Sequence, residues 1–198
     1  MTNLIERFID KEFKLLKDLI SNKGTIQDNN ISVETYHFLY LTGLAFIFRR
    51  QNKFYISMTD DVYNTIKEIN LNKIQKIVDE NTKVYHLTRS MVELYGAFSY
   101  SYLNSCYSLY YGKGKELETS YNALLFCERI DNIDTFNTEN NMYFAHKIFR
   151  HKDLDNLLDS IISRQEIIRR KPIKPEELLK YSDYDYYEKT EAKNKFKK

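Results

Sequence analysis

The stretch GLAFIFRRQNKFYISM, residues 43–58, predicts two strands joined by a turn. Residues 45–48 and 54–58 are rich in aromatic and branched side chains, which favour strands. The connection between them lacks an Asn-Gly pair, but Asn52 can adopt the positive φ that a tight turn requires. We therefore predict a β-hairpin. Its tip carries three basic residues, Arg49, Arg50 and Lys53.

Helices are expected on both sides of this hairpin. Apolar residues at helical spacing predict a helix over residues 3–21, and Ser32 can cap a second helix that ends near Leu41. After the hairpin, Thr59 is a suitable N-cap for a further helix. This order predicts a winged-helix-like module over residues 1–70, with two helices before the hairpin where the usual plan has three.

The remaining residues, 71–198, are predicted to form an α-helical domain, so that the fold as a whole is mainly α. Gly (5) and Pro (2) are scarce, which favours long helices with short connections. Residues 142–149 fit either a short strand or the start of a helix, and Pro175 marks the start of a C-terminal helix. The other predicted helices span residues 71–78, 84–95, 97–110, 115–130 and 153–170, with a polar connection over residues 131–141.

Composition and charge limit the classes of function. The formal net charge is +2, and residues 1–70 hold nine basic and nine acidic side chains, unlike the strongly basic balance of a dedicated nucleic-acid binder. The two cysteines make no disulfide framework. The first residues lack the features of a signal peptide, and no apolar run is long enough to span a membrane. We expect a cytoplasmic protein without a membrane partner.

No pattern in the chain indicates catalysis, a metal or a cofactor. His146 and His151 are the nearest pair of His or Cys residues, and their spacing does not place them on one helical face. Cys106 and Cys127 lie in apolar helical patterns typical of small buried residues. We therefore expect no enzyme. A hydrolase of unfamiliar type would need His, Cys and carboxylate side chains to converge in one pocket.

The charged clusters allow two interpretations each. Basic residues at a hairpin tip can contact phosphates, but they also keep an exposed strand edge from pairing with other chains. A second basic cluster around Arg169 and Arg170 follows a predicted helix end, where the helix dipole alone favours cations. The segment YSDYDYYEKT, residues 181–190, is either a docking strip or a packed terminal segment. The candidate interaction surface comprises Arg169, Arg170, Tyr184, Tyr186 and Tyr187.

Two segments resemble a group of bacterial helical proteins, some of which carry a SEC-C zinc motif. The pattern R…KP…EELLKY…YYEKT, within residues 150–198, is similar to their C-terminal helical region. The segment LTGLAFIFRRQNKFYISMTDDVYNTI, residues 41–66, resembles their N-terminal module. The Cys-x-Cys…Cys-His-Cys tail of SEC-C proteins is absent here, so the resemblance implies a fold and neither a metal nor a zinc-linked interaction.

These patterns together predict a non-enzymatic nucleic-acid-binding regulatory protein. Arg49, Arg50 and Lys53 would contact phosphates, and the exposed face of the helix over residues 34–42 would approach the groove. That helix is rich in aromatic residues and poor in the Arg, Asn and Gln side chains that usually read bases. The alternative is a protein-interaction adaptor or inhibitor, for example one encoded by a mobile element or phage, that uses a tyrosine-rich helical surface.

Overall fold

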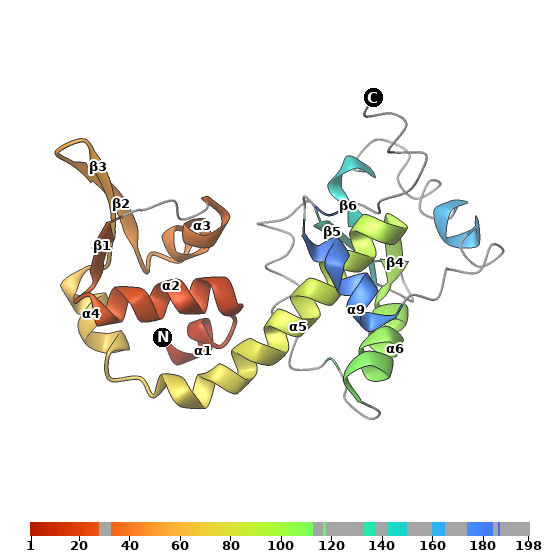
Figure 1. Ribbon diagram of the computed structural model, residues 1–198, viewed down its shortest axis with the longest axis horizontal. Helices are drawn as coiled ribbons and strands as arrows, with labels where there is room; N and C mark the ends of the chain where they lie inside the picture. Colours follow the sequence, from red (N-terminus) through yellow and green to blue (C-terminus); the bar gives the residue numbers. More distant parts are fainter. Residues whose placement is uncertain are drawn as a thin grey trace. The chain divides into compact units, whose positions relative to one another are not determined.

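The computed structural model describes residues 1–27, 33–112, 117, 133–137, 142–149, 160–164, 174–183 and 186. Its contacts divide the chain into two compact units. The first comprises Met1–Tyr85 with Leu117–Asp131, and the second comprises His86–Glu116 with Asn132–Lys198. The protein is mainly helical, as predicted, and contains two small antiparallel sheets (Figure 1). The predicted boundary near residue 70 stays a prediction.

The first unit contains one of the two sheets. Its elements are α1 (Thr2–Ile5), α2 (Asp10–Ser21), β1 (Thr25–Gln27), α3 (Val33–Leu41), β2 (Phe46–Arg50), β3 (Lys53–Ser57), α4 (Asp60–Ile66) and the first part of α5 (Leu71–Tyr95). The second unit contains the end of α5 together with β4 (Ala97–Ser99), α6 (Tyr100–Tyr111), β5 (Ile133–Asn137), β6 (Met142–His146), η2 (Lys147–Phe149), α9 (Pro175–Leu178) and η3 (Leu179–Ser182). None of the described helices is long and apolar enough to cross a membrane.

The predicted hairpin is confirmed as β2 and β3. The strands pair in antiparallel register up to Arg50, which lies opposite Lys53. The turn is therefore two residues long, and both Gln51 (φ 49°) and Asn52 (φ 59°) have positive φ. Two such residues make a type I′ turn, whose twist matches that of the paired strands. The positive φ expected of Asn52 is confirmed.

The inner face of this sheet packs on the helices of the first unit. One residue from each strand lies on that face at the same register, since Ile26 and Ile47 both pair with Ile56. Ile56 is buried and the other two are partly buried against the core. Phe8 and Phe38 meet there edge to face, with ring centroids 5.2 Å apart. The core therefore fixes which face of the hairpin points away from it.

Two predicted helix boundaries in the first unit are confirmed. Gly24 ends α2 with a φ of 85°, and its N–H donates to the carbonyl of Leu19 at 2.7 Å. The left-handed position directly after the C-cap Asn22 is taken by Lys23 (φ 55°), and Gly24 follows it, also with a positive φ. Thr59 caps α4, since its hydroxyl oxygen accepts a hydrogen bond from the N–H of Val62 at 3.4 Å. The predicted cap at Ser32 lies outside the described residues.

The single helix predicted over residues 3–21 is wrong, because the chain turns between α1 and α2. Ile9 is extended (φ −103°, ψ 173°), and its N–H donates to the Glu12 carboxylate at 2.8 Å. The N–H of Asp10 donates to the Thr82 hydroxyl at the same distance. The start of α2 therefore depends on a contact from residues far along the chain, which the local apolar spacing cannot reveal.

The predicted break between the helices 71–78 and 84–95 is also absent, because α5 is continuous from Leu71 to Tyr95. The intervening polar residues contribute to tertiary structure. Asn81, only 1% exposed, donates to the carbonyl oxygens of Glu6 at 2.8 Å and Phe8 at 3.0 Å. The side chain of Asn81 thus supplies the hydrogen-bond donors that the backbone carbonyls of the turn between α1 and α2 require.

A second sheet, in the order β4–β6–β5, corrects the prediction of an all-helical C-terminal domain. Residues 97–99 form a strand where the start of a helix was predicted, and α6 begins at Tyr100 with Ser99 as its N-cap. Phe98 stacks on Phe144 of β6 with ring centroids 5.4 Å apart. Tertiary pairing, more than local propensity, makes these short strands.

The other predicted elements are described only in part. The polar connection 131–141 contains β5, and residues 142–149 form β6 followed by the 3₁₀ turn η2. The helix predicted at Pro175 is confirmed as α9. Residues 160–164 are helical, within the predicted helix 153–170, whose other residues lie outside the described part of the chain. Of the predicted helix 115–130, the structure describes only Leu117.

Candidate nucleic-acid interface

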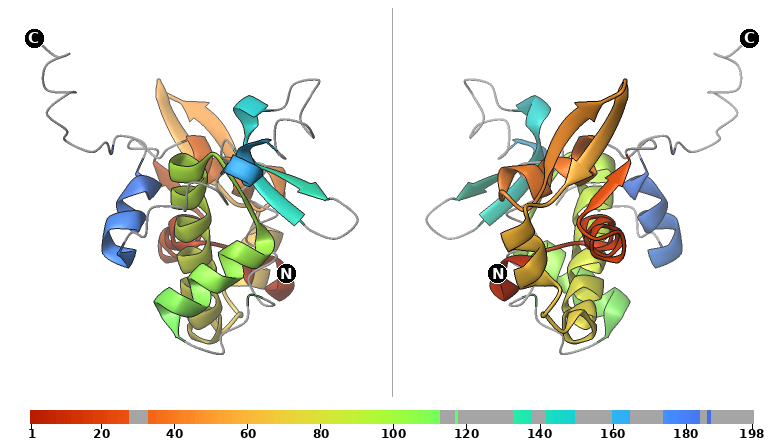
Figure 2. Two further views of the ribbon diagram at one scale, coloured as in Figure 1. Left: turned by 90° about the vertical axis from the view of Figure 1, so that its right-hand side faces the viewer. Right: turned by 90° about the vertical axis from the view of Figure 1, so that its left-hand side faces the viewer.

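The β2–β3 hairpin extends beyond the strand that supports it. β1 pairs only with the last part of β3, from Tyr55 to Ser57. Within the part of the chain that the structure describes, no third strand lies beside the tip of the hairpin, and the tip projects from the sheet in both views of Figure 2. Each strand of this projection presents alternate side chains to two different faces.

The face that points away from the core carries aromatic rings. Phe46 and Phe48 are 44% and 42% exposed, although both are large apolar side chains. Phe48 lies directly opposite Tyr55, and their rings stack with centroids 5.4 Å apart and planes only 16° from parallel. These rings form an aromatic surface that the fold leaves partly in contact with water.

Arg50 and Lys53 continue the same row toward the tip. They form the last register pair of the hairpin, two residues beyond Phe48 and Tyr55. Both side chains are exposed. We call this set, comprising Phe46, Phe48, Tyr55, Arg50 and Lys53, the outer face of the hairpin. It presents an aromatic surface at one end and two cations at the other.

Arg49 lies on the opposite face, so the structure does not bring the three predicted phosphate contacts together on one side. Its guanidinium donates to the Asn52 side chain at 2.8 Å and lies over the Phe54 ring, 5.8 Å from the centroid. The alternation of side chains along a strand is the signal that separates Arg49 from Arg50. The same alternation places Phe46 and Phe48 on the same face as Arg50, which the sequence interpretation missed.

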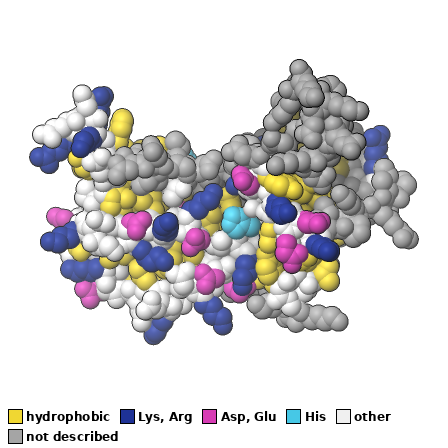
Figure 3. Space-filling view, viewed as in Figure 1, with side chains coloured by type: hydrophobic (Ala, Val, Ile, Leu, Met, Phe, Trp, Pro, Cys, Tyr) yellow, Lys and Arg dark blue, Asp and Glu magenta, His cyan; other side chains and the backbone are white. Residues whose placement is uncertain are grey.

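The hairpin is locally positive although the N-terminal part of the chain is neutral. Residues 43–58 include Arg49, Arg50 and Lys53 and no Asp or Glu. Among the described residues, none of these three cations is shown in an ion pair. Lys and Arg side chains gather around the hairpin tip, with hydrophobic side chains directly beside them (Figure 3).

The helix predicted to approach a groove, α3, carries no Lys or Arg. Its exposed side chains include Tyr40 and Leu41, 55% and 51% exposed, while Phe38 and Leu39 are buried in the core. Duplex-reading helices usually present Arg, Lys, Asn or Gln to base edges. The chemistry of α3 therefore gives little support to readout of a duplex groove.

The second predicted interaction surface falls mostly outside the described residues. Arg169, Arg170, Tyr184 and Tyr187 are not described. Tyr186 packs edge to face on Tyr181, with ring centroids 5.0 Å apart. A docking function for this segment stays a prediction.

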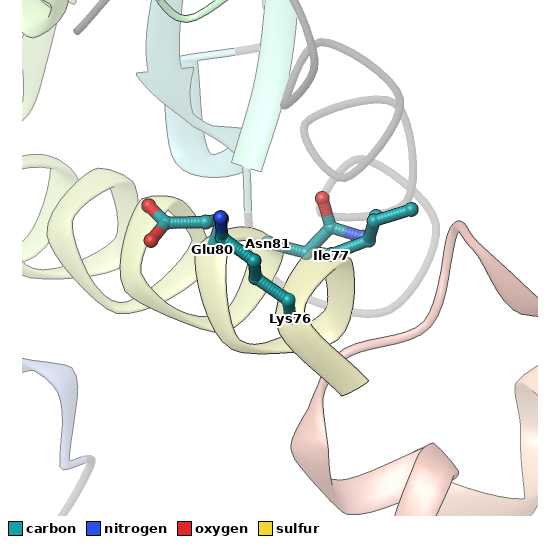
Figure 4. Close-up of a pocket in the computed structure, with 4 residues that line it drawn as sticks. All are labelled: Lys76, Ile77, Glu80 and Asn81. Atoms are coloured by element: carbon teal, nitrogen blue, oxygen red, sulfur yellow. The ribbon is translucent and has the colours of Figure 1, made fainter. Parts of the chain in front are cut away.

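A small pocket lies along α5 in the first unit (Figure 4). Its described lining is Lys76, Ile77, Glu80 and Asn81. Asn81 is engaged with two backbone carbonyls, and Glu80 forms the ion pair with Lys83 at 2.8 Å. Two of the polar side chains of this pocket are thus engaged within the protein, and we assign no ligand to it.

The described residues offer no metal site, since no group of three His, Cys, Asp or Glu side chains could hold an ion. Cys106 is buried, as predicted, and Cys127 lies outside the described part of the chain. Burial, together with the nearby Cys106 and Tyr95, raises the pKa of Tyr110 to about 12. That phenol stays protonated at neutral pH and cannot act there as a base.

Comparison of the chain with protein-family models, curated proteins and solved structures gives no match. The resemblance to helical proteins of the SEC-C group therefore stays a prediction. The geometry and charge of the hairpin are the observations from which a function can be argued.

Proposed function

We propose that this is a non-enzymatic nucleic-acid-binding protein with a regulatory role in the cytoplasm. The observation that carries the proposal is the concentration of Arg49, Arg50 and Lys53 on a projecting hairpin that holds no acidic residue. Phosphate contacts supply most of the non-specific affinity of proteins for nucleic acids, and exposed Arg and Lys side chains make them.

The order of elements supports a winged-helix-like use of the hairpin. Three helices, α1, α2 and α3, precede the hairpin, and β1 joins it in the sheet order β1–β3–β2. α1 is a single turn of four residues. In this proposal β2 and β3 serve as the wing, with their tip against the phosphate backbone.

The neutral charge balance of the surrounding residues limits the expected affinity. Three cations without a wider basic surface give a limited affinity and a slope of log affinity against log salt of only about −2.7 on a duplex, because the slope grows with the number of phosphates contacted. We expect dissociation constants in the ordinary non-specific range, about 10⁻⁴ to 10⁻⁶ M at physiological salt.

The test is fluorescence anisotropy of labelled oligonucleotides, duplex and single-stranded, over a salt series from about 50 to 200 mM. Wild type is compared with the variant Arg49→Ala/Arg50→Ala/Lys53→Ala. Loss of three phosphate contacts should flatten the slope of log affinity against log salt by about 2.7 on a duplex or about 2.1 on a single strand. A smaller change, near two thirds of these values, would mean that Arg49 on the opposite face does not participate.

A matched control removes three other cations from the same unit. Lys14, Lys73 and Lys76 are exposed on α2 and α5, away from the hairpin, and their replacement by Ala changes the net charge equally. The control variant should keep the wild-type slope. Equal losses in both variants would show that only net charge matters, and absence of binding by wild type would reject the proposal.

A further inference from the structure

We infer that the outer face of the hairpin binds unpaired bases, so that the preferred ligand is single-stranded nucleic acid. This inference rests on the proposed function and adds the class of nucleic acid. Its basis is that exposed aromatic rings and cations without an ion pair among the described residues lie on one face of the hairpin. Exposing the two phenylalanines to water does not stabilise the fold, so their position favours a role in binding.

The arrangement of this face matches the two parts of a nucleotide. Phe48 and Tyr55 stack on each other, and an unpaired base can continue that stack. Phe46 lies two residues away along β2, about 6.8 Å at the usual rise, twice the 3.4 Å spacing of stacked bases. Separate rings can therefore hold separate bases of an extended strand.

The cations lie where the backbone of such a strand would continue. Arg50 and Lys53 face each other across the hairpin, one register step of the same face beyond Phe48 and Tyr55. β1, β2 and β3 contain no Asp or Glu that would repel phosphates. Sheet faces that bind single strands combine these two features, aromatic stacking and a positive path for the backbone.

A duplex could not use the aromatic part of this face. Its bases are stacked on each other, so their flat surfaces are not available to Phe46, Phe48 or Tyr55. A duplex would meet only the cations, and the neighbouring α3 carries no Lys or Arg to add to them. The same hairpin should therefore hold a single strand more tightly than a duplex of equal length.

The experiment compares oligo-dT, oligo-rU and a duplex of the same length by anisotropy at one salt concentration. Phe48→Ala should weaken single-strand binding by about 5- to 150-fold, the range for loss of one stacked base, and leave duplex binding unchanged. Phe48→Tyr keeps a ring and should keep affinity. Comparing dT with rU shows whether the sugar is also read.

Phe54→Ala is the matched control, because Phe54 is 50% exposed on the same hairpin but on the opposite face. It should not alter the affinity for a single strand. Circular dichroism of each variant establishes that it remains folded.

The outcomes separate this inference from the proposed function. Binding that depends on Arg50 and Lys53, but shows no preference for single strands and no effect of Phe48→Ala, would overturn the stacking inference and leave the proposed function standing. No binding to any of the three oligonucleotides would reject both, and the exposed rings would then point to a protein partner.

Discussion

Phe8→Ala should lower the free energy of unfolding by about 3–5 kcal/mol. Phe8 is fully buried and meets Phe38 edge to face at 5.2 Å, and its carbonyl oxygen accepts a hydrogen bond from Asn81. Truncation of the Phe8 ring leaves a cavity in the core, because the surrounding residues relax only partly to fill it. Because small domains are stable by only about 5–15 kcal/mol, this single change removes a large fraction of the total.

Urea denaturation followed by circular dichroism measures this loss as a shift of the midpoint at constant slope. The same substitution on the hairpin provides the control. Phe54→Ala removes an equally large ring that is half exposed, and should change stability by no more than about 0.5 kcal/mol. Similar effects of the two substitutions would contradict the assignment of core and surface.

Asn81→Leu should lower the free energy of unfolding by about 3 kcal/mol. It should do so although leucine is the better helix former. The side-chain amide of Asn81 satisfies the carbonyl oxygens of Glu6 and Phe8, and each buried acceptor left without a donor costs about 1–3 kcal/mol. The change should detach the turn between α1 and α2 and lower the protection of its amides from hydrogen exchange.

Asn72→Leu, on the same helix but at an exposed position, is the matched substitution. It should be neutral or slightly stabilising, because it gains helix propensity and loses no buried partner. If Asn81→Leu behaves in the same way, the polar residues within α5 do not hold the N-terminal turn in place.

The parts of the fold that depend on local chemistry could be predicted from the sequence. The hairpin follows from two runs of aromatic and branched residues. The positive φ of Gly24 and the cap at Thr59 follow from what glycine and a capping hydroxyl favour. These signals lie within a few residues of the structure that they specify.

The missed features depend on residues distant in sequence. α2 starts at Asp10 because Thr82 accepts its N–H, and α5 stays intact where its polar residues suggested a break. The second sheet forms because β4 pairs with β6, where Phe98 lies opposite Phe144 and their rings stack. No local pattern contains such pairings, so strands of three to five residues were read as helix or connection.

The candidate site was predicted in part. The cations of the hairpin tip were identified, but their separation onto two faces requires the register, in which Arg50 pairs with Lys53 and Arg49 with Phe54. The aromatic residues were interpreted only as strand formers. The exposure of Phe46 and Phe48 can be known only once the core is seen to lie on the other side of the sheet.

The most direct measurement is photo-cross-linking of wild-type protein to oligo-dT that contains 5-iodo-2′-deoxyuridine, followed by mass spectrometry of the tryptic peptides. A base stacked on the outer face should cross-link to the peptides 24–49 and 54–67, which contain Phe46, Phe48 and Tyr55. Cross-links confined to peptides of the second unit, or found equally with Phe48→Ala, would contradict the account.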